Sequence, residues 1–292
     1  MRSLLLPAIA ALLIGAAPAK LLTPNDIVTA SPASAWRTIP ADDVLVMDLK
    51  SGGRVVLQLA PAFAPVHVAN IRALARGNYW DGATIYRVQD AYVAQWGLND
   101  SDKGFPAGVT AKPPAEYTRA LKGLAVKPLG YADPYAPGAG FVDGWPVAYN
   151  AKANWANLAH CYGSVGVGRD LSPDTGTGGE LYAVFTPLRH LDRNIAVVGR
   201  VIDGMANLSA LPRGTEALGF YKDKAQYVPI ASIRLASDMP AADRPAYEYL
   251  DTRSASFATY LKLRANRHDD FYIRPAGGVD LCNVQVPVRK KA

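Results

Sequence analysis

The sequence predicts a mainly β protein in which an antiparallel sheet closes on itself. Segments with β-strand composition are short and numerous, segments with helical periodicity are few, and turn signals recur at close intervals. Gly and Pro, which both favour turns, account for 25 and 22 of the 292 residues. Short antiparallel strands joined by tight turns favour a small closed barrel. The pattern alone does not distinguish one small barrel from another.

Composition and charge restrict the class of protein. Half of the residues are hydrophobic and 19% are charged, which is typical of a globular chain with a substantial core. The formal net charge is +6, but Lys and Arg are scattered apart from the run at 289–291. No basic stripe interleaved with aromatic residues occurs, so nucleic-acid binding is not expected.

Residues 1–19 have the layout of a secretory signal peptide. Arg2 provides a positive charge, residues 4–14 form an apolar run, and the Ala-Pro-Ala at 17–19 is a cleavage site of the A-x-A type. Cleavage after Ala19 places the mature protein in the periplasm or outside the cell. The alternative is a retained membrane anchor. No later segment reaches the length of a transmembrane helix, so no stable membrane span is expected.

The chain has two cysteines, Cys161 and Cys282. Neither lies in a metal-ligand spacing, and no metal site is expected. In an oxidising compartment such a pair predicts one disulfide, which would tie the C-terminal part to the middle of the chain. The alternative is two buried thiols.

The expected elements follow in chain order. Residues 20–42 lack periodicity and are expected to form a linker or a loosely docked arm. Two β-rich runs flank a Gly-Gly turn and predict a hairpin. A helix is expected after Pro65, with apolar residues at helical spacing up to Arg76 and with Gly77 as its end. The predicted strands lie at 44–49, 54–59, 85–88, 92–95, 163–168, 181–185, 195–201 and 230–235, and a short helix at 204–211.

Two segments differ from this pattern. Residues 99–160 form a long stretch rich in turn residues, which inside a compact domain indicates a functional loop or a decoration. Residues 237–292 change in composition and are expected to form a C-terminal extension. Within it, residues 243–267 are rich in Ala, Leu, Arg and Tyr and predict a helix.

Two ordered blocks of residues are more specific than the general pattern. The first reads Trp-Asp-Gly at 80–82, Ile-Tyr-Arg-Val at 85–88 and Tyr-Val-Ala-Gln-Trp-Gly at 92–97. The second reads Gly-Gly-Glu-Leu-Tyr at 178–182, His-Leu-Asp at 190–192, Val-Val-Gly-Arg-Val at 197–201 and Asp-Gly-Met at 203–205. In order and spacing these blocks resemble the cyclophilin-type peptidyl-prolyl cis-trans isomerases. The resemblance covers residues 43–236, interrupted by the insertion 99–160.

The resemblance implies a closed eight-stranded antiparallel barrel that is capped by two helices and carries its active groove on the outer face. The insertion and the helical C-terminal extension are added to that barrel. The implied activity is the cis/trans isomerisation of Xaa-Pro bonds, here in exported proteins. The expected partners are therefore proline-containing polypeptides, and the sequence does not indicate an oligomeric state.

The expected chemistry needs no nucleophile, general base, metal or cofactor. An Xaa-Pro bond isomerises over a barrier of about 18–20 kcal/mol because its C–N bond has partial double-bond character. A donor aimed at the prolyl nitrogen weakens that conjugation, and a guanidinium suits the role since it stays charged and projects rigid N–H groups. The resemblance assigns this catalytic role to Arg87. It assigns to Gln95 the task of orienting the arginine or holding the substrate carbonyl.

The resemblance also implies an apolar pocket for the proline ring. The substrate-binding positions that it implies are Tyr92, Val93, Glu180, Tyr182, His190 and Leu191.

Three positions differ from the family pattern. Glu180 replaces a glutamine, and a carboxylate there can form an ion pair with Arg87; such a pair would hold the guanidinium away from the substrate and reduce turnover, and the sequence leaves open whether it forms. Trp96 replaces a glycine and is expected beside the groove, whereas Tyr86 is expected to face away from the side of Arg87. The alternative function is therefore a catalytically weak proline-peptide-binding module or scaffold. An assembly role of residues 99–160 is a third hypothesis.

Overall fold

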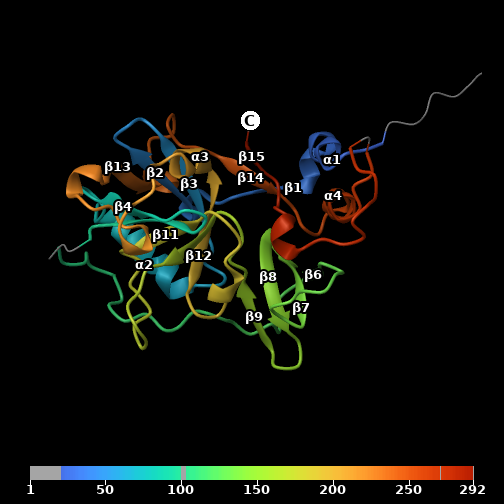
Figure 1. Ribbon diagram of the computed structural model, residues 1–292, viewed down its shortest axis with the longest axis horizontal. Coiled ribbons are helices and arrows are strands. Elements are labelled where there is room, and N and C mark those ends of the chain that lie inside the picture. Colours follow the sequence, from blue (N-terminus) through green and yellow to red (C-terminus); the bar gives the residue numbers. More distant parts are fainter. Residues whose placement is uncertain (1–20, 100–102, 270, 292) are drawn as a thin grey trace, which may run out of the picture.

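The computed structural model describes residues 21–99, 103–269 and 271–291, so the predicted signal peptide lies outside the described residues. Eight antiparallel strands form a closed barrel, as the sequence analysis predicted. Around the barrel, the strands are β10 (Ser164–Val167), β11 (Leu181–Val184), β5 (Val93–Gly97), β4 (Thr84–Val88), β13 (Val228–Leu235), β2 (Val44–Leu49), β3 (Arg54–Leu59) and β12 (Val197–Asp203). Figure 1 shows the barrel on the left of the molecule.

The predicted hairpin of β2 and β3 shows how the sequence fills the barrel. The two strands pair from Val44 opposite Gln58 to Asp48 opposite Arg54. Alternate residues point inward, and Leu45, Met47 and Leu57 are at most 1% exposed in the main core. Burying such side chains supplies most of the free energy that holds the barrel together.

Two helices pack against the barrel core. Helix α2 (Pro65–Arg76) begins with Pro65, which lacks a backbone N–H; this costs nothing there, because the N–H groups of the first turn have no acceptor within the helix. Gly77 follows the last residue as the C-cap. Its buried face places Val68, Ile71 and Leu74 in the same cluster as the barrel interior. The short helix α3 (Met205–Ser209) adds the fully buried Leu208.

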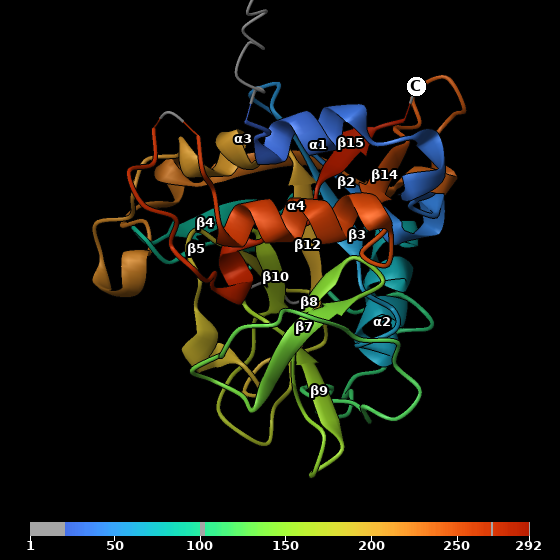
Figure 2. The same cartoon turned by 90° about the vertical axis from the view of Figure 1, so that its right-hand side faces the viewer.

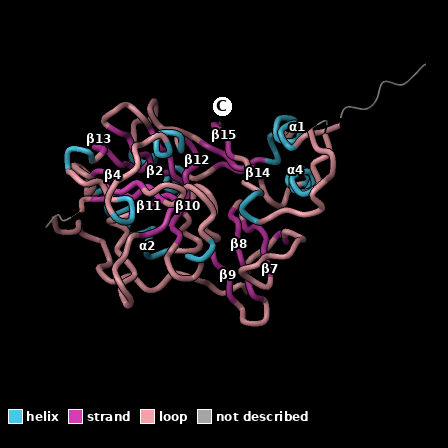
Figure 3. The backbone as a smooth tube through the Cα atoms, viewed as in Figure 1, coloured by secondary structure: helices cyan, strands magenta, loops and turns pink. Residues whose placement is uncertain are grey.

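Residues 99–160 contain a second sheet, which the sequence analysis did not predict. Its strands, in spatial order, are β6 (Lys127–Pro128), β7 (Gly138–Val142), β8 (Trp145–Asn150) and β9 (Trp155–Leu158). Val142, Trp145 and Val147 of this sheet pack against Ala60 and Val197 of the barrel. The insertion is therefore a packed layer. Much of the insertion before β6 is loop, drawn in pink in Figure 3.

The expected N-terminal arm and the C-terminal extension form one structure. Helix α1 (Pro24–Ala30) begins with a Thr23 capping box and packs near α4 (Ala255–Ala265). Strand β1 (Trp36–Thr38) pairs with β14 (Tyr247–Leu250), and β14 pairs with β15 (Val288–Lys290). Figure 2 shows α1 and α4 together in front of the barrel.

Two expectations for these segments were wrong. Residues 21–42 do not form the expected linker or loosely docked arm: they contain α1 and β1, and β1 pairs with β14, which lies more than 200 residues later in the sequence. The helix predicted over 243–267 starts only at Ala255, where the Ser254 hydroxyl caps the Phe257 N–H. Strand β14, with Tyr247 and Leu250 buried at its two ends, precedes this helix in extended conformation.

Short 3-10 turns connect several of these elements. They are η1 (Ala33–Ala35), η2 (Ala41–Asp43), η3 (Arg189–Leu191), η4 (Ala217–Gly219), η5 (Lys224–Gln226), η6 (Ala236–Asp238) and η7 (Leu281–Asn283).

The predicted disulfide joins Cys161, just before β10, to Cys282 in η7. Both cysteines lie in a buried cluster with Phe141 of the second sheet and Phe257 of α4. The bond therefore fixes the C-terminal extension to the middle of the chain. None of the helices in the described ranges is long and apolar enough to cross a membrane.

Candidate active site

A row of side chains crosses neighbouring strands of the barrel. Arg87 of β4 lies directly opposite Gln95 of β5, and Gln95 lies opposite Tyr182 of β11. On β10, Gly166 faces Tyr182, and a Cβ atom at position 166 would lie 2.2 Å from the Tyr182 hydroxyl. A glycine is therefore required there for Tyr182 to lie along the sheet.

These residues line a groove with a cavity of about 570 Å³. Such a volume is typical of ligand pockets. Six of the residues singled out in the sequence line it: Arg87, Tyr92, Val93, Gln95, Tyr182 and Leu191. Val93 and Tyr182 are buried in an apolar cluster that also contains Val184 and Leu188. The groove thus has an apolar floor with a guanidinium and an amide at its side.

The Arg87 guanidinium is held by three neutral acceptors. It donates to Gln95 Oε1 (3.0 Å), Gln89 Oε1 (2.7 Å) and the Leu218 carbonyl (2.7 Å). The rings of Tyr92 and Phe220 lie 5.7 and 5.3 Å from its Cζ atom. Partial burial lowers the pKa of Arg87, but an arginine with an ordinary value above 12 remains a cation at neutral pH.

The sequence analysis missed the loop that covers Arg87. Leu218, Gly219 and Phe220 belong to this loop, and Gly219 has φ +79° and approaches Gln89 so closely that a Cβ atom would lie 2.5 Å from the Gln89 Cα. The loop is far from Arg87 in the sequence and carries no motif. Of the three acceptors that the sequence had to place beside Arg87, Gln89 could have been found beyond those already named, because it is two residues further along and residues two apart on a strand point to the same face.

The ion pair considered between Glu180 and Arg87 is not formed. The Glu180 carboxylate accepts hydrogen bonds from the Tyr86 hydroxyl (2.6 Å) and the Asn99 N–H (3.2 Å). The Gln95 amide in turn donates to the Tyr86 hydroxyl at 2.6 Å. Glu180 is therefore connected to Arg87 through Tyr86 and Gln95, and it is not among the residues that line the groove.

A β-bulge explains why the expectation for Tyr86 was wrong. Between Ile85 and Arg87 the pairing with β5 shifts by one residue, so Tyr86 is the extra residue of the bulge. Its hydroxyl consequently reaches Gln95 instead of facing away. Burial raises the pKa of Tyr86 and the negative charge of Glu180 raises it further, so the hydroxyl stays protonated and can donate.

Trp96 also differs from its expected position. It is 1% exposed and lies in the main core of the barrel. Gln95 points outward, and alternation then directs the next side chain inward. Trp96 therefore adds no apolar surface to the groove.

His190 lies at the edge of the groove without lining it. It is exposed, and its ring stacks on Tyr92 with 6.3 Å between the ring centres. Its neighbour Leu191 does line the groove.

A buried chain of polar side chains lies behind Tyr182. The Tyr182 hydroxyl contacts His160 Nε2 (3.2 Å), and His160 Nδ1 contacts Asp192 (3.1 Å). Arg189 donates to Asp192 (2.6 Å) and to both oxygens of Asp133 (2.8 and 3.1 Å). The side chains of Asp133 and His160 are fully buried. Asp133 belongs to the insertion, which is thus connected to the floor of the groove.

The described residues contain no candidate metal centre of several side chains. Within residues 21–99, 103–269 and 271–291, no group of three or more His, Cys, Asp and Glu residues is arranged to hold a metal ion.

Comparisons with known proteins place the chain in a family. The sequence profile of the family described as "Cyclophilin type peptidyl-prolyl cis-trans isomerase/CLD" matches residues 44–235. A "Probable peptidyl-prolyl cis-trans isomerase" of Brucella suis biovar 1 is 27% identical over 194 residues, which cover 65% of this chain and 79% of the relative. Its counterpart in Brucella abortus is 26% identical over the same shares. The crystal structure of cyclophilin AquaCyp293 from Hirschia baltica superposes with a TM-score of 0.71 at 22% identity, covering 92% of this chain and 97% of that one.

Proposed function

The chain belongs to the cyclophilin-type peptidyl-prolyl cis-trans isomerase family, and from this premise we propose that it isomerises Xaa-Pro bonds of exported polypeptides, with Arg87 as the catalytic residue. The observation that carries the proposal is the position of Arg87 beside an apolar groove, held by neutral acceptors. Since these acceptors carry no charge, the positive charge of Arg87 remains available to a substrate.

Arg87 acts by hydrogen bonding to the prolyl nitrogen. A guanidinium has five N–H groups, and the three hydrogen bonds to Gln95, Gln89 and Leu218 leave two for a substrate. When the C–N bond twists, the nitrogen becomes pyramidal and gains a lone pair that accepts such a hydrogen bond. The interaction is therefore stronger in the transition state than in the ground state, which is the condition for catalysis.

The groove provides the binding energy and the orientation. Val93, Tyr182 and Leu191 offer apolar surface to the proline ring, and Tyr92 stands beside Arg87 at the edge. Holding the ring fixes one side of the Xaa-Pro bond, so that rotation moves the residue before proline. Gln95 accepts a hydrogen bond from the guanidinium at 3.0 Å and so helps to fix its orientation beside the groove.

The experiment is a protease-coupled assay of an Xaa-Pro peptide with wild-type protein and with Arg87→Ala and Arg87→Lys. We expect kcat/KM to fall by at least about 100-fold in Arg87→Ala, because removing one oriented transition-state hydrogen-bond donor from an enzyme active site has an effect of this size. We expect a loss of at least about tenfold in Arg87→Lys, because an ammonium keeps the charge but not the rigid fork. Arg234→Ala is the control, since Arg234 of β13 pairs with Asp81 and does not line the groove.

Unchanged turnover in Arg87→Ala removes this residue from the mechanism. Binding of a proline peptide without turnover in the wild type supports the alternative, a proline-peptide-binding module or scaffold. The alternative was based on Glu180, Trp96, the insertion and the C-terminal extension. Glu180 contacts Tyr86 and Trp96 is in the core, so these two residues no longer support it, whereas the insertion and the extension are present.

Export of the chain is a separate part of the proposal. It is supported by the signal-peptide pattern of residues 1–19 and by the Cys161–Cys282 disulfide, since disulfides persist in oxidising compartments. Mass spectrometry of the N-terminus of protein from a periplasmic fraction should find Lys20 as the first residue. Recovery of the chain with Met1 in the membrane fraction would instead support a retained anchor.

A further inference from the structure

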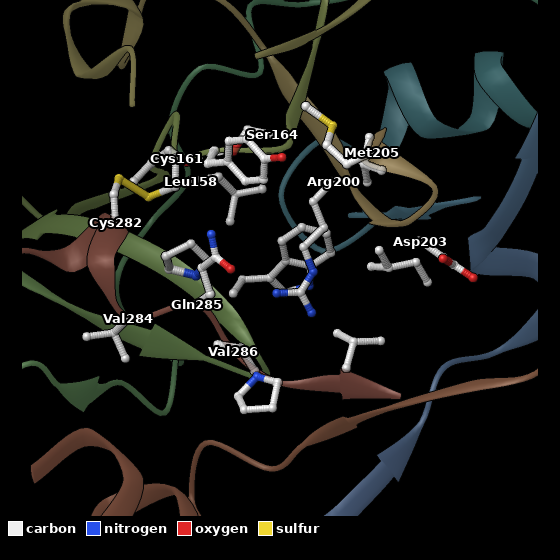
Figure 4. Close-up of a pocket in the computed structure, with 18 of the residues that line it drawn as sticks. Leu158, Cys161, Ser164, Arg200, Asp203, Met205, Cys282, Val284, Gln285 and Val286 are labelled. Atoms are coloured by element: carbon white, nitrogen blue, oxygen red, sulfur yellow. Dashed lines mark hydrogen bonds between the residues drawn. A yellow bond between two sulfur atoms is a disulfide. The ribbon is translucent and has the colours of Figure 1, made fainter. Parts of the chain in front are cut away.

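A second cavity, of about 550 Å³, lies between the barrel and the C-terminal extension. It shares no lining residue with the groove. Its walls come from β12 of the barrel, from Trp145 of the second sheet and from the segment 282–288 of the extension. Figure 4 shows the Arg200 guanidinium in the middle of this cavity, with the Cys161–Cys282 disulfide and Asp203 on opposite sides.

Arg200 has only neutral hydrogen-bond partners. Its Nε and Nη2 donate to Gln58 Oε1 (3.0 and 2.8 Å), and its Nη1 donates to the Gly144 carbonyl (2.8 Å). The guanidinium also lies over the Trp145 ring, 4.7 Å from its centre. Among the described residues, no carboxylate forms an ion pair with Arg200. Two of its five N–H groups remain for another acceptor.

Another arginine of the chain shows what is missing at Arg200. Arg189 is buried and contacts the carboxylates of Asp133 and Asp192, whereas Arg200 is half-buried and contacts neutral groups. Charges removed from water are ordinarily paired in this way. Burial lowers the pKa of Arg200 to about 10, so the side chain is still a cation at neutral pH, and no carboxylate of the part of the chain that the structure describes pairs with it.

The other walls of the cavity define the rest of a ligand. Leu158, Val284 and Val286 are buried apolar residues that line it, and the exposed Gln285 adds an amide. Asp203 also lines the cavity, but its carboxylate pairs with Lys290 (3.3 Å) and accepts from Tyr247 (2.6 Å). The cavity thus combines one unpaired positive charge with apolar surface.

We propose that this cavity is a second binding site, which takes an organic monocarboxylate with an apolar body. The carboxylate of the ligand pairs with the Arg200 guanidinium, and the hydrocarbon part contacts the apolar walls between the barrel and the extension. A carboxylate suits the fork of a guanidinium, since both are planar and can form two parallel hydrogen bonds. A small inorganic anion would leave the apolar walls without a partner.

The test is calorimetric titration of the full, disulfide-bonded protein with octanoate, 1-octanol and octylamine, which share one hydrocarbon chain. We expect octanoate to bind with a stoichiometry of one and at least about tenfold more tightly than 1-octanol, as a charged hydrogen-bonded contact implies. Octylamine should bind more weakly than either. Arg87→Ala should bind octanoate like the wild type, because the groove is a different cavity.

Two variants test whether octanoate binds in the cavity at Arg200. Arg200→Met removes the charge and should abolish the preference for octanoate over 1-octanol. Because this variant also removes the contacts to Gln58 and Gly144, a second variant leaves Arg200 in place. Gln285→Glu adds a negative charge at an exposed position of the cavity wall and should lower the affinity for octanoate by at least about tenfold. Gln285→Ala is its neutral control and should bind octanoate nearly as the wild type does.

Three results would overturn the proposal. Equal binding of octanoate and 1-octanol means that the cavity does not recognise an anion. No binding of octanoate at millimolar concentration means that Arg200 has a structural role alone, in which it links the Gln58 side chain to the Gly144 carbonyl by hydrogen bonds. Binding that survives Gln285→Glu but is lost in Arg87→Ala places octanoate in the groove.

Discussion

At the scale of single residues, the partners of an arginine decide what it can do. Arg189 contacts two buried carboxylates, which neutralise its charge and fix it within the protein. Arg87 is held equally firmly by two glutamine side chains and a carbonyl, which orient the guanidinium without neutralising it. A catalytic donor needs the second arrangement, because a carboxylate at the same position would compete with the substrate for the N–H groups.

Two charge changes around Arg87 test this reasoning. Glu180→Gln should change kcat/KM by less than about threefold, because Glu180 contacts Tyr86 and not the guanidinium. Gln95→Glu places a carboxylate at the position 3.0 Å from Arg87 and should lower kcat/KM by at least about tenfold. The protease-coupled assay measures both, with thermal unfolding as the control for folding. A strong gain in Glu180→Gln would instead show that Glu180 restrains Arg87.

Acid stability provides a second test at this scale. Although burial alone would raise it, the contacts with His160 and Arg189 lower the pKa of Asp192. The carboxylate therefore stabilises the fold above the unfolded-state value of about 3.9, and this contribution is lost as the pH falls through the lower folded-state value. Urea unfolding between pH 5 and pH 2 should show a smaller loss of stability in Asp192→Asn than in the wild type. Equal slopes would contradict the role of this carboxylate.

At the scale of elements, the insertion supports the groove. Asp133 lies in the insertion, Arg189 in η3 and Tyr182 on β11, and they are joined through Asp192 and His160. The hydrogen bond between the Tyr182 hydroxyl and His160 keeps the tyrosine ring in one orientation. The floor of the groove thus depends on a segment that is distant in the sequence.

Removing Asp133 should therefore affect both stability and substrate binding. Asp133→Ala removes one of the two carboxylates that contact the buried Arg189 and leaves the N–H groups that bonded Asp133 without their acceptor, and we expect a loss of about 3 kcal/mol in the free energy of unfolding. Asp90→Ala is the matched control, since the Asp90–Arg213 pair is exposed and such pairs contribute at most about 1 kcal/mol.

In the same two variants, a rise in KM with little change in kcat is expected only for Asp133→Ala, because Tyr182 contacts the substrate without taking part in the bond rotation. Equal unfolding free energies and equal KM values in the two variants would contradict the positioning role of Asp133.

At the scale of the whole molecule, local signals and distant contacts were predictable to different degrees. The hairpin 44–59 and the order of the two motif blocks predicted the barrel and brought Arg87, Gln95 and Tyr182 together, because these features depend on neighbours in sequence or on alternation within strands. The pairing of β1 with β14 and the loop over Arg87 depend on segments more than 100 residues apart. One bulge at Tyr86 was enough to redirect a side chain that simple alternation had assigned to the other face.

The disulfide is the long-range contact that the sequence did predict, and its effect on the whole molecule can be measured. Cys161 and Cys282 are 121 residues apart, and closing a loop of that length restricts the unfolded chain. The chain-entropy model gives a stabilisation of about 4–5 kcal/mol. The variant with both Cys161→Ala and Cys282→Ala should lose about this free energy of unfolding in urea without reductant. Wild-type protein with reductant should match the variant, whereas reductant should leave the variant unchanged. A variant as stable as the oxidised wild type would show that packing around Phe141 and Phe257 holds the extension without the bond.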